Sequence, residues 1–189
     1  IGVSTLSAAT TANMNVAIGQ SAMESVAASV ALEGAIGIGK DALQTINSTD
    51  ANGTIAIGYQ AALGLTESQY NTVIGYGALQ TVTDSGDGNT VIGYEAGKLL
   101  AAAAENTIIG YNAAQNMTAG YNTFVGHNAG HDLTTGQYNV LMGVSAGANI
   151  TGSEQNVILG AYAGRMLQAS KRLIAIGYEA GYMAPTGYQ

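Results

Sequence analysis

The chain has 189 residues, a net charge of −7, and charged side chains at only 9% of its positions. The five basic residues are scattered, which argues against nucleic acid as a partner because such binding needs clustered Lys and Arg. The lack of cysteine excludes disulfides and thiolate metal sites, and no apolar run approaches the roughly 20 residues that cross a bilayer.

From Val16 onward, one motif recurs ten times: a short apolar segment, Gly, two variable residues and Ala. The clearest copies begin at residues 71, 89 and 106 with Asn-Thr-(Val or Ile)-Ile-Gly. The motif glycines, 16 to 20 residues apart, are Gly19, Gly39, Gly58, Gly75, Gly93, Gly110, Gly126, Gly143, Gly160 and Gly177. Such a period predicts a solenoid in which each repeat forms one coil.

The apolar segment before each motif Gly is predicted to be a strand of about five residues. It is β-branched three positions before the Gly and apolar one position before it, as in Thr107 and Ile109. Because strand side chains alternate between faces, apolar residues at neighbouring positions mean that both faces are covered. We expect one face to line the interior of the coil and the other to need a partner.

The segment after each Gly carries Ala at its third position and an apolar residue at its seventh. A spacing of four predicts one or two helical turns, and Asp41, Asn112 or Ser145 stands just before the Ala, where an N-cap belongs. Closing Thr-x-Gly sequences at 118–120 and 134–136 would place Gly at C′. A second strand fits the same spacing and is the alternative. The motif alanines are Ala22, Ala42, Ala61, Ala78, Ala96, Ala113, Ala129, Ala146, Ala163 and Ala180.

The predicted fold is therefore a mainly β repeat solenoid, a stack like a parallel β-helix or β-roll, running as one array through residues 1–189. Ten coils at ~4.8 Å per strand would make a rod about 50 Å long. Coils of some 17 residues enclose little core, so we expect several chains to bundle together. Ile1-Gly2 matches the end of an earlier motif, and residues 186–189 match 135–138, so we expect a segment of a longer fibre.

The pattern Asn-Thr-Val-Ile-Gly-Tyr-x-Ala, seen at 71–78 and in related form at 106–113, resembles repeats of phage tail-fibre proteins and related bacterial surface proteins. Segments such as 16–19 and 174–177 also resemble the head repeats of trimeric autotransporter adhesins, whose repeats are shorter. The resemblance covers essentially the whole chain. It implies homotrimers in which parallel β-coils wind side by side into a stiff shaft. The chain shows no stalk heptads, which favours the phage fibre.

Two ranks of side chains are predicted from the stacking of repeats. Tyr59, Tyr76, Tyr94 and Tyr111 follow the motif Gly in four successive repeats, with Tyr178 at the same position later. Stacking predicts an aromatic ladder that stabilises the coils; the functional alternative is a stripe that binds sugars. Asparagines at 15, 71, 89, 106, 122, 139 and 156 are predicted to form a structural amide ladder.

Other candidate sites are weak. His127 and His131 have a spacing suited to one metal ion, with Asp132 as the nearest further ligand, but solvated or ladder histidines are favoured. Asp84 and Asp87 lie in a Gly-rich insertion where Ca²⁺ is conceivable, although a solvated loop is favoured. We expect no metal, no cofactor and no enzymatic activity, because neither paired carboxylates nor a nucleophile with its base is evident.

The expected function is that of a structural segment of a homotrimeric phage tail fibre, located in the virion, which projects a receptor-binding tip for host attachment. Its expected partners are further copies of itself and other fibre or virion proteins, with host surface glycan as a further candidate, and without nucleic acid or membrane insertion. The alternative is a cell-surface adhesin or extracellular filament whose repeat surface binds glycan or self-assembles.

Overall fold

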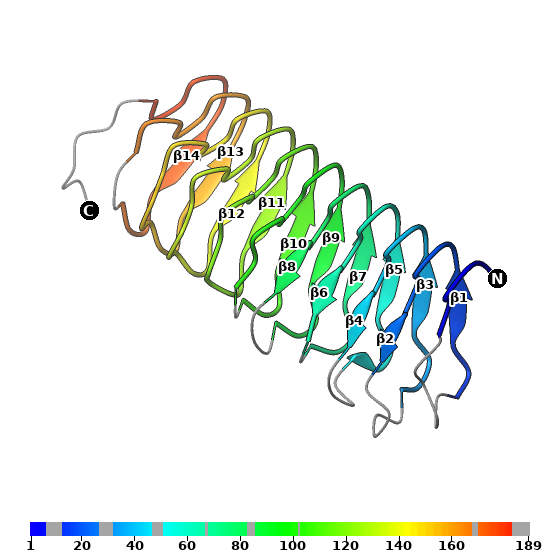
Figure 1. The fold of residues 1–189 in the computed structure, drawn as a ribbon. Coiled ribbons are helices and arrows are strands. Elements are labelled where there is room, and N and C mark those ends of the chain that lie inside the picture. Colours follow the sequence, from blue (N-terminus) through cyan, green and yellow to red (C-terminus); the bar gives the residue numbers. More distant parts are fainter. Residues whose placement is uncertain are drawn as a thin grey trace.

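The structure, a computed structural model, describes residues 1–6, 13–26, 32–46, 51–66, 68–82, 86–101, 103–167 and 170–182. They form a parallel β-solenoid, and each repeat adds one coil to an elongated stack (Figure 1). Ten strands of three residues, one per motif, form a continuous sheet along it. In spatial order they are β1 (Val16–Ile18), β3 (Ile36–Ile38), β5 (Ile55–Ile57), β7 (Thr72–Ile74), β9 (Thr90–Ile92), β10 (Thr107–Ile109), β11 (Thr123–Val125), β12 (Val140–Met142), β13 (Val157–Leu159) and β14 (Ile174–Ile176). The predicted solenoid is confirmed, with strands shorter than expected.

The register of this long sheet follows the sequence motif without a slip. Thr107 of β10 pairs with Thr90 of β9 on one side and with Thr123 of β11 on the other. The same alignment holds for every neighbouring pair, so the differences in repeat length are absorbed in the connections. Each position of the repeat therefore becomes a rank of equivalent side chains that runs along the rod.

The helical turn predicted after each motif Gly is wrong: the described residues contain no α-helix. Asn112 and Ala114, two and four positions after Gly110, have left-handed φ angles of 50° and 46°. The N–H of Ala114 donates to the carbonyl oxygen of Ala129 in the next coil (3.0 Å). Backbone groups in this segment thus bond between coils instead of within a helix, and the expected N-cap positions are left-handed turn residues.

The alternative, a second strand, is found in the N-terminal half of the stack. β2 (Ser25–Val26) pairs with β4 (Thr45–Ile46), and β6 (Gly64–Leu65) pairs with β8 (Thr81–Val82), both in parallel. The Thr-x-Gly glycines are not left-handed C′ residues either. A Cβ on Gly120 would lie 2.5 Å from the carbonyl oxygen of Ala104, so this glycine permits close contact between coils.

The motif glycine serves two needs at once. All ten motif glycines have φ between +126° and +143°, a region that favours glycine. A Cβ on Gly110 would also overlap the carbonyl oxygen of Gly126 in the next coil. The N–H of Gly126 in turn donates to the carbonyl oxygen of Ile109 (2.8 Å), which continues the sheet through the turn.

The core fills the inside of the coils. It is built from the middle residue of each long-sheet strand, the motif Ala, the residue after that Ala, and the apolar residue four positions after the Ala. The nine motif alanines from Ala22 to Ala163 are fully buried. Large and small side chains compensate across this core: a Cβ on Gly130 would collide with the ring of Phe124, and one on Gly37 would meet Met23 at 3.1 Å.

Candidate functional site

The solvent side of the long sheet is a regular surface that runs across all ten strands. The first and third residues of each strand point outward, because the middle residue is the buried one in β10 and its neighbours. The outward ranks hold Val, Ile or Thr at the first position and Ile, Val, Met or Leu at the third. Ile109 retains 36% of its exposure, which is high for an apolar side chain in the middle of a sheet.

A third outward rank follows directly after the motif Gly. It contains four tyrosines and a histidine in succession, at residues 59, 76, 94, 111 and 127. We call these three ranks together the outer face. Ten repeats with three outward positions each give thirty side chains, of which only Lys40 carries a full charge. The other sixteen of the chain's 17 Asp, Glu, Lys and Arg residues lie elsewhere in the repeat.

The tyrosines and His127 form a single stacked ladder. The centroids of successive rings, from Tyr59 through Tyr76, Tyr94 and Tyr111 to His127, lie 4.8, 5.2, 4.9 and 5.2 Å apart, and neighbouring planes are tilted by 9° to 17°. The predicted aromatic ladder is therefore present, and His127 joins it as the ladder histidine that the sequence allowed. Tyr178 stands apart and meets Tyr162 edge-on at 6.0 Å.

Stacking changes what the ladder can bind. Each of Tyr76, Tyr94 and Tyr111 has both ring faces covered by its neighbours, although 41% to 49% of each residue remains exposed. The exposed parts are therefore ring edges and hydroxyl groups. Stacking of a sugar ring on these tyrosines would require a free aromatic face, which the ladder does not offer. This geometry favours a packing role for the four predicted stripe residues.

Charged side chains lie at one end of the ladder and beside it. The ammonium group of Lys40 lies 5.7 Å from the centroid of the Tyr59 ring, within cation–π range. The carboxylate of Glu95 raises the pKa of the neighbouring Tyr94 phenol, because a nearby negative charge disfavours the phenolate. Glu95 also accepts a hydrogen bond from Lys98 (2.9 Å), and this bond raises the pKa of Lys98.

The predicted asparagine ladder is confirmed from residue 71 to residue 156. The side-chain oxygen of Asn106 accepts the backbone N–H of Asn122 (2.9 Å), and that of Asn122 accepts the backbone N–H of Asn139 (2.9 Å). Side-chain amides also donate along the ladder, as from Asn139 to Asn122 (3.1 Å). The side-chain oxygen of Asn15 accepts the backbone N–H of residue 35 in the same way. Residue 35 is Ala, so the ladder is interrupted at this point.

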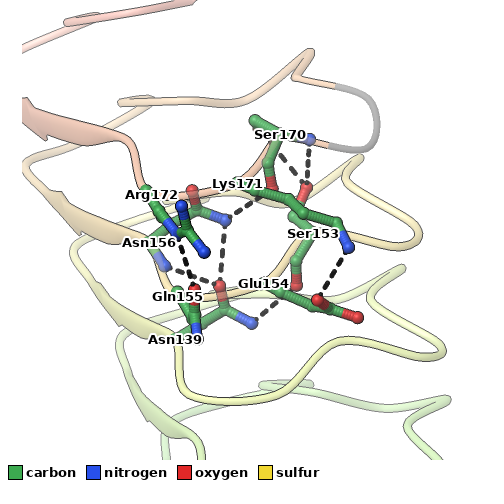
Figure 2. Close-up of polar contacts among 8 residues, drawn as sticks. All are labelled: Asn139, Ser153, Glu154, Gln155, Asn156, Ser170, Lys171 and Arg172. Carbon is green, nitrogen blue, oxygen red and sulfur yellow. Dashed lines mark hydrogen bonds and ion pairs between the residues drawn. The ribbon is translucent and has the colours of Figure 1, made fainter. Parts of the chain in front are cut away.

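Figure 2 shows how this ladder is anchored near its C-terminal end. The amide of Asn139 donates to the carbonyl oxygen of Ser153 (2.8 Å), and that of Asn156 donates to the carbonyl oxygen of Ser170 (3.0 Å). The N–H of Ser170 donates to the hydroxyl of Ser153 (3.1 Å). Nearby surface pairs between coils, such as Lys171 with Glu154 (2.9 Å), add little because they are exposed.

The remaining candidate sites do not converge. Nδ1 of His131 lies 2.6 Å from a carboxylate oxygen of Asp132, while His127 belongs to the aromatic ladder. Within the described residues, no three His, Asp or Glu side chains gather as metal ligands would. Asp87 accepts the backbone N–H of Gln69 (2.8 Å), and Asp84 lies outside the described residues.

Two features were missed from the sequence. Each coil turns a corner five positions before the motif Gly with a left-handed residue, which is glycine in only three repeats, and these positions carry no common residue type. At two of these corners, Tyr121 and Tyr138 form a second stacked pair with centroids 5.3 Å apart. Only the equal spacing of Tyr121 and Tyr138 from their motif glycines could have indicated this pair.

Comparison with protein-family models, curated proteins and solved structures finds no match for this chain. In the described part of the chain there is also no helix with the length and apolar character needed to cross a membrane.

Proposed function

We propose that the chain is a structural segment of a homotrimeric fibre of the bacteriophage tail-fibre type, acting in the virion to hold a receptor-binding tip at a distance from its base. The observation that carries this proposal is the unbroken sheet. One register runs through all ten strands, and hydrogen bonds between coils continue through the motif glycines and the asparagine ladder. A rod built in this way resists bending along its whole length.

The proposal also gives a role to the residues that recur most strictly. The motif glycines and alanines allow coils to approach closely, and they occupy the inside or the edge of every turn. These residues set the rise and the stiffness of the rod, which are the properties that a shaft needs. Further copies of the chain and adjoining fibre proteins are the proposed partners.

A second candidate is a bacterial surface adhesin or extracellular filament whose repeat surface binds glycan. One observation favours it: the ladder displays a row of phenol hydroxyls spaced at about the interval of the coils. Such a row can donate and accept hydrogen bonds along an extended polysaccharide. It would recognise the sugar through ring edges and hydroxyls, since the faces are covered.

A glycan array probed with the 189-residue chain distinguishes the two functions. We expect no glycan binding from a shaft segment. Binding that disappears in the double variant Tyr76→Ala/Tyr94→Ala, but persists in Tyr178→Ala, would overturn the shaft in favour of the adhesin. Tyr178 is the matched control because it occupies the same repeat position outside the ladder.

A further inference from the structure

The outer face is the apolar, nearly uncharged surface that a partner chain would cover with the greatest gain. We infer that copies of this chain meet through the outer face, side by side, parallel and in register, with the aromatic ladder at the rim of the contact. This inference rests on the proposed function as a multi-chain fibre and adds which surface joins the chains. Other surfaces of the coil then remain in solvent.

The distribution of charge selects this face. Desolvating a charge is costly unless it is paired, whereas covering apolar side chains is favourable. The outer face holds one of the 17 charged side chains of Asp, Glu, Lys and Arg, although it takes up three of roughly 17 positions in each repeat. Lys40, that one exception, lies in the same rank as the tyrosines, over the ring of Tyr59.

The repeat period identifies the partner as another copy. The outer face presents one ridge of side chains per strand, so its surface repeats at the strand spacing of ~4.8 Å. Only a surface with the same period can mesh with it over ten strands without falling out of step. A second copy has that period by construction. Parallel copies in register place the threonines of β7, β9, β10 and β11 beside their own equivalents.

The size of the face agrees with an interface. Ten strands at ~4.8 Å, multiplied by the ~13 Å between the first and third outward ranks, give a projected area on the order of 600 Å². Monomeric proteins rarely expose an apolar patch of more than a few hundred Å², and stable interfaces cover about 800 Å² per partner. The outer face is therefore at the upper end of the patch sizes found on free surfaces and close to the size of a specific contact.

The ladder suits the rim of this contact. Tyrosine edges combine an apolar ring with a hydroxyl that can remain hydrated, and such residues are favoured where a contact meets water. The third-position rank of Ile, Val, Met and Leu, by contrast, has no polar group to lose, and the only polar groups of the first-position rank are the threonine hydroxyls of the central strands. Within the outer face, the two strand ranks thus form the dry centre and the ladder forms the wet margin.

Single cysteines test this assignment cleanly because the chain has none of its own. We expect Thr107→Cys, in the first strand rank of the outer face and midway along the rod, to form interchain disulfides under mild oxidation, seen as dimers on a non-reducing gel. Thr135→Cys, at an exposed position away from the long sheet, is the control and is expected to stay uncrosslinked. Cross-links from Thr135→Cys and none from Thr107→Cys, in an oligomeric protein, would overturn the face while leaving the fibre intact.

Direction is tested by two further positions. In a parallel contact Ile36→Cys in β3 joins its own equivalent, and so does Val157→Cys in β13. In an antiparallel contact the two variants, when refolded together, would join each other, because β3 and β13 are each second from an end of the sheet. Exclusive formation of the mixed product would contradict parallel packing.

A charge placed on the face provides an independent readout. Ile74→Glu/Ile109→Glu replaces two partly exposed side chains, so the coil is expected to keep its circular dichroism spectrum while the oligomer dissociates to monomer. Thr135→Glu is expected to change neither property. A wild-type chain that is monomeric at all concentrations would refute the multi-chain fibre itself. An oligomer that survives the double variant would refute only the choice of face.

Discussion

At the scale of single residues, the motif glycine combines a backbone requirement with a steric one. Gly110→Ala forces a Cβ against the carbonyl oxygen of Gly126 and places Ala at φ +143°. We expect it to lower the free energy of unfolding by about 3 kcal/mol or more, measured by urea denaturation.

Two other glycines separate the causes of that loss. A Cβ on Gly34, at φ +68°, would meet no heavy atom within 4 Å, so Gly34→Ala isolates the backbone strain and is expected to cost about 1 kcal/mol. A Cβ on Gly152 would meet only the Thr135 hydroxyl at 3.7 Å, and Gly152→Ala is expected to change stability by less than ~0.5 kcal/mol. Equal losses at all three positions would contradict this account of the motif.

The core offers a second test at this scale. In some coils the middle residue of the strand is large and the residue after the motif Ala is small, and in other coils the sizes are reversed. Gly130→Met overpacks the core against Phe124 and is expected to cost about 2 kcal/mol, and Phe124→Ala alone about 3 to 5 kcal/mol. The double variant imitates the Ala17 and Met23 arrangement of the first coil. We expect it to recover at least ~1 kcal/mol relative to the sum, again from urea denaturation. Strict additivity would show that the two sites do not share space.

At the scale of elements, the asparagine ladder ties one coil to the next. Asn106→Ala removes the acceptor for the N–H of Asn122 and the donor to Asn89, both in buried surroundings. Leaving buried polar groups unpaired costs about 1 to 3 kcal/mol each, so we expect a loss of about 2 kcal/mol or more in thermal or urea unfolding. Asn116→Ala is the control, since among the described residues its side chain has no hydrogen-bond partner. A similar loss in both variants would argue against a special role for the ladder.

The tyrosine ladder makes stability depend on pH in the alkaline range. Glu95 raises the pKa of Tyr94 above the ordinary value of about 10, so the folded chain keeps a proton that the unfolded chain begins to release. The unfolded state then binds fewer protons, and stability falls as the pH rises from about 10 through the raised pKa of Tyr94. We expect Tm to fall less steeply in Tyr94→Phe and in Glu95→Gln than in the parent chain. An unchanged slope in both variants would contradict this linkage.

The strands, their register and the outward apolar ranks were predictable because β-branched runs recur at a fixed distance from a glycine that no other residue can replace. The turn after that glycine was not, because Ala and an apolar residue four positions apart fit a helix as well as a bend. Asn112 belongs to a residue type that adopts a left-handed backbone more often than most, but Ala114 carries no such mark. Bonds between coils override their local preference, and such bonds are not visible in the sequence of one repeat.

The ladder illustrates the same limit at the candidate site. Equal spacing placed Tyr59 to Tyr111 in one rank, and it allowed His127 to join them. The closeness of the rings, near 5 Å, follows only from the stacking of the coils. That closeness covers the ring faces and turns a candidate sugar stripe into a ladder that exposes edges.

At the scale of the whole molecule, the solenoid is a thin rod whose coils enclose a narrow core. The ten-stranded sheet leaves an apolar, almost uncharged face along the full length of the rod. Charged residues make up only 9% of the chain, so few of them are available to keep such a rod in solution as a monomer. Association along the outer face would thicken the rod and bury this surface. The central claim is therefore that the working unit contains several chains.

The most direct test of that claim is the native mass of the 189-residue chain, measured by light scattering over a range of concentrations. Three chains of 19.0 kDa each give a mass of about 57 kDa, and we expect this species to persist on dilution. A well-folded particle of 19.0 kDa at every concentration would mean that each coil is sufficient by itself. That result would contradict the trimeric shaft.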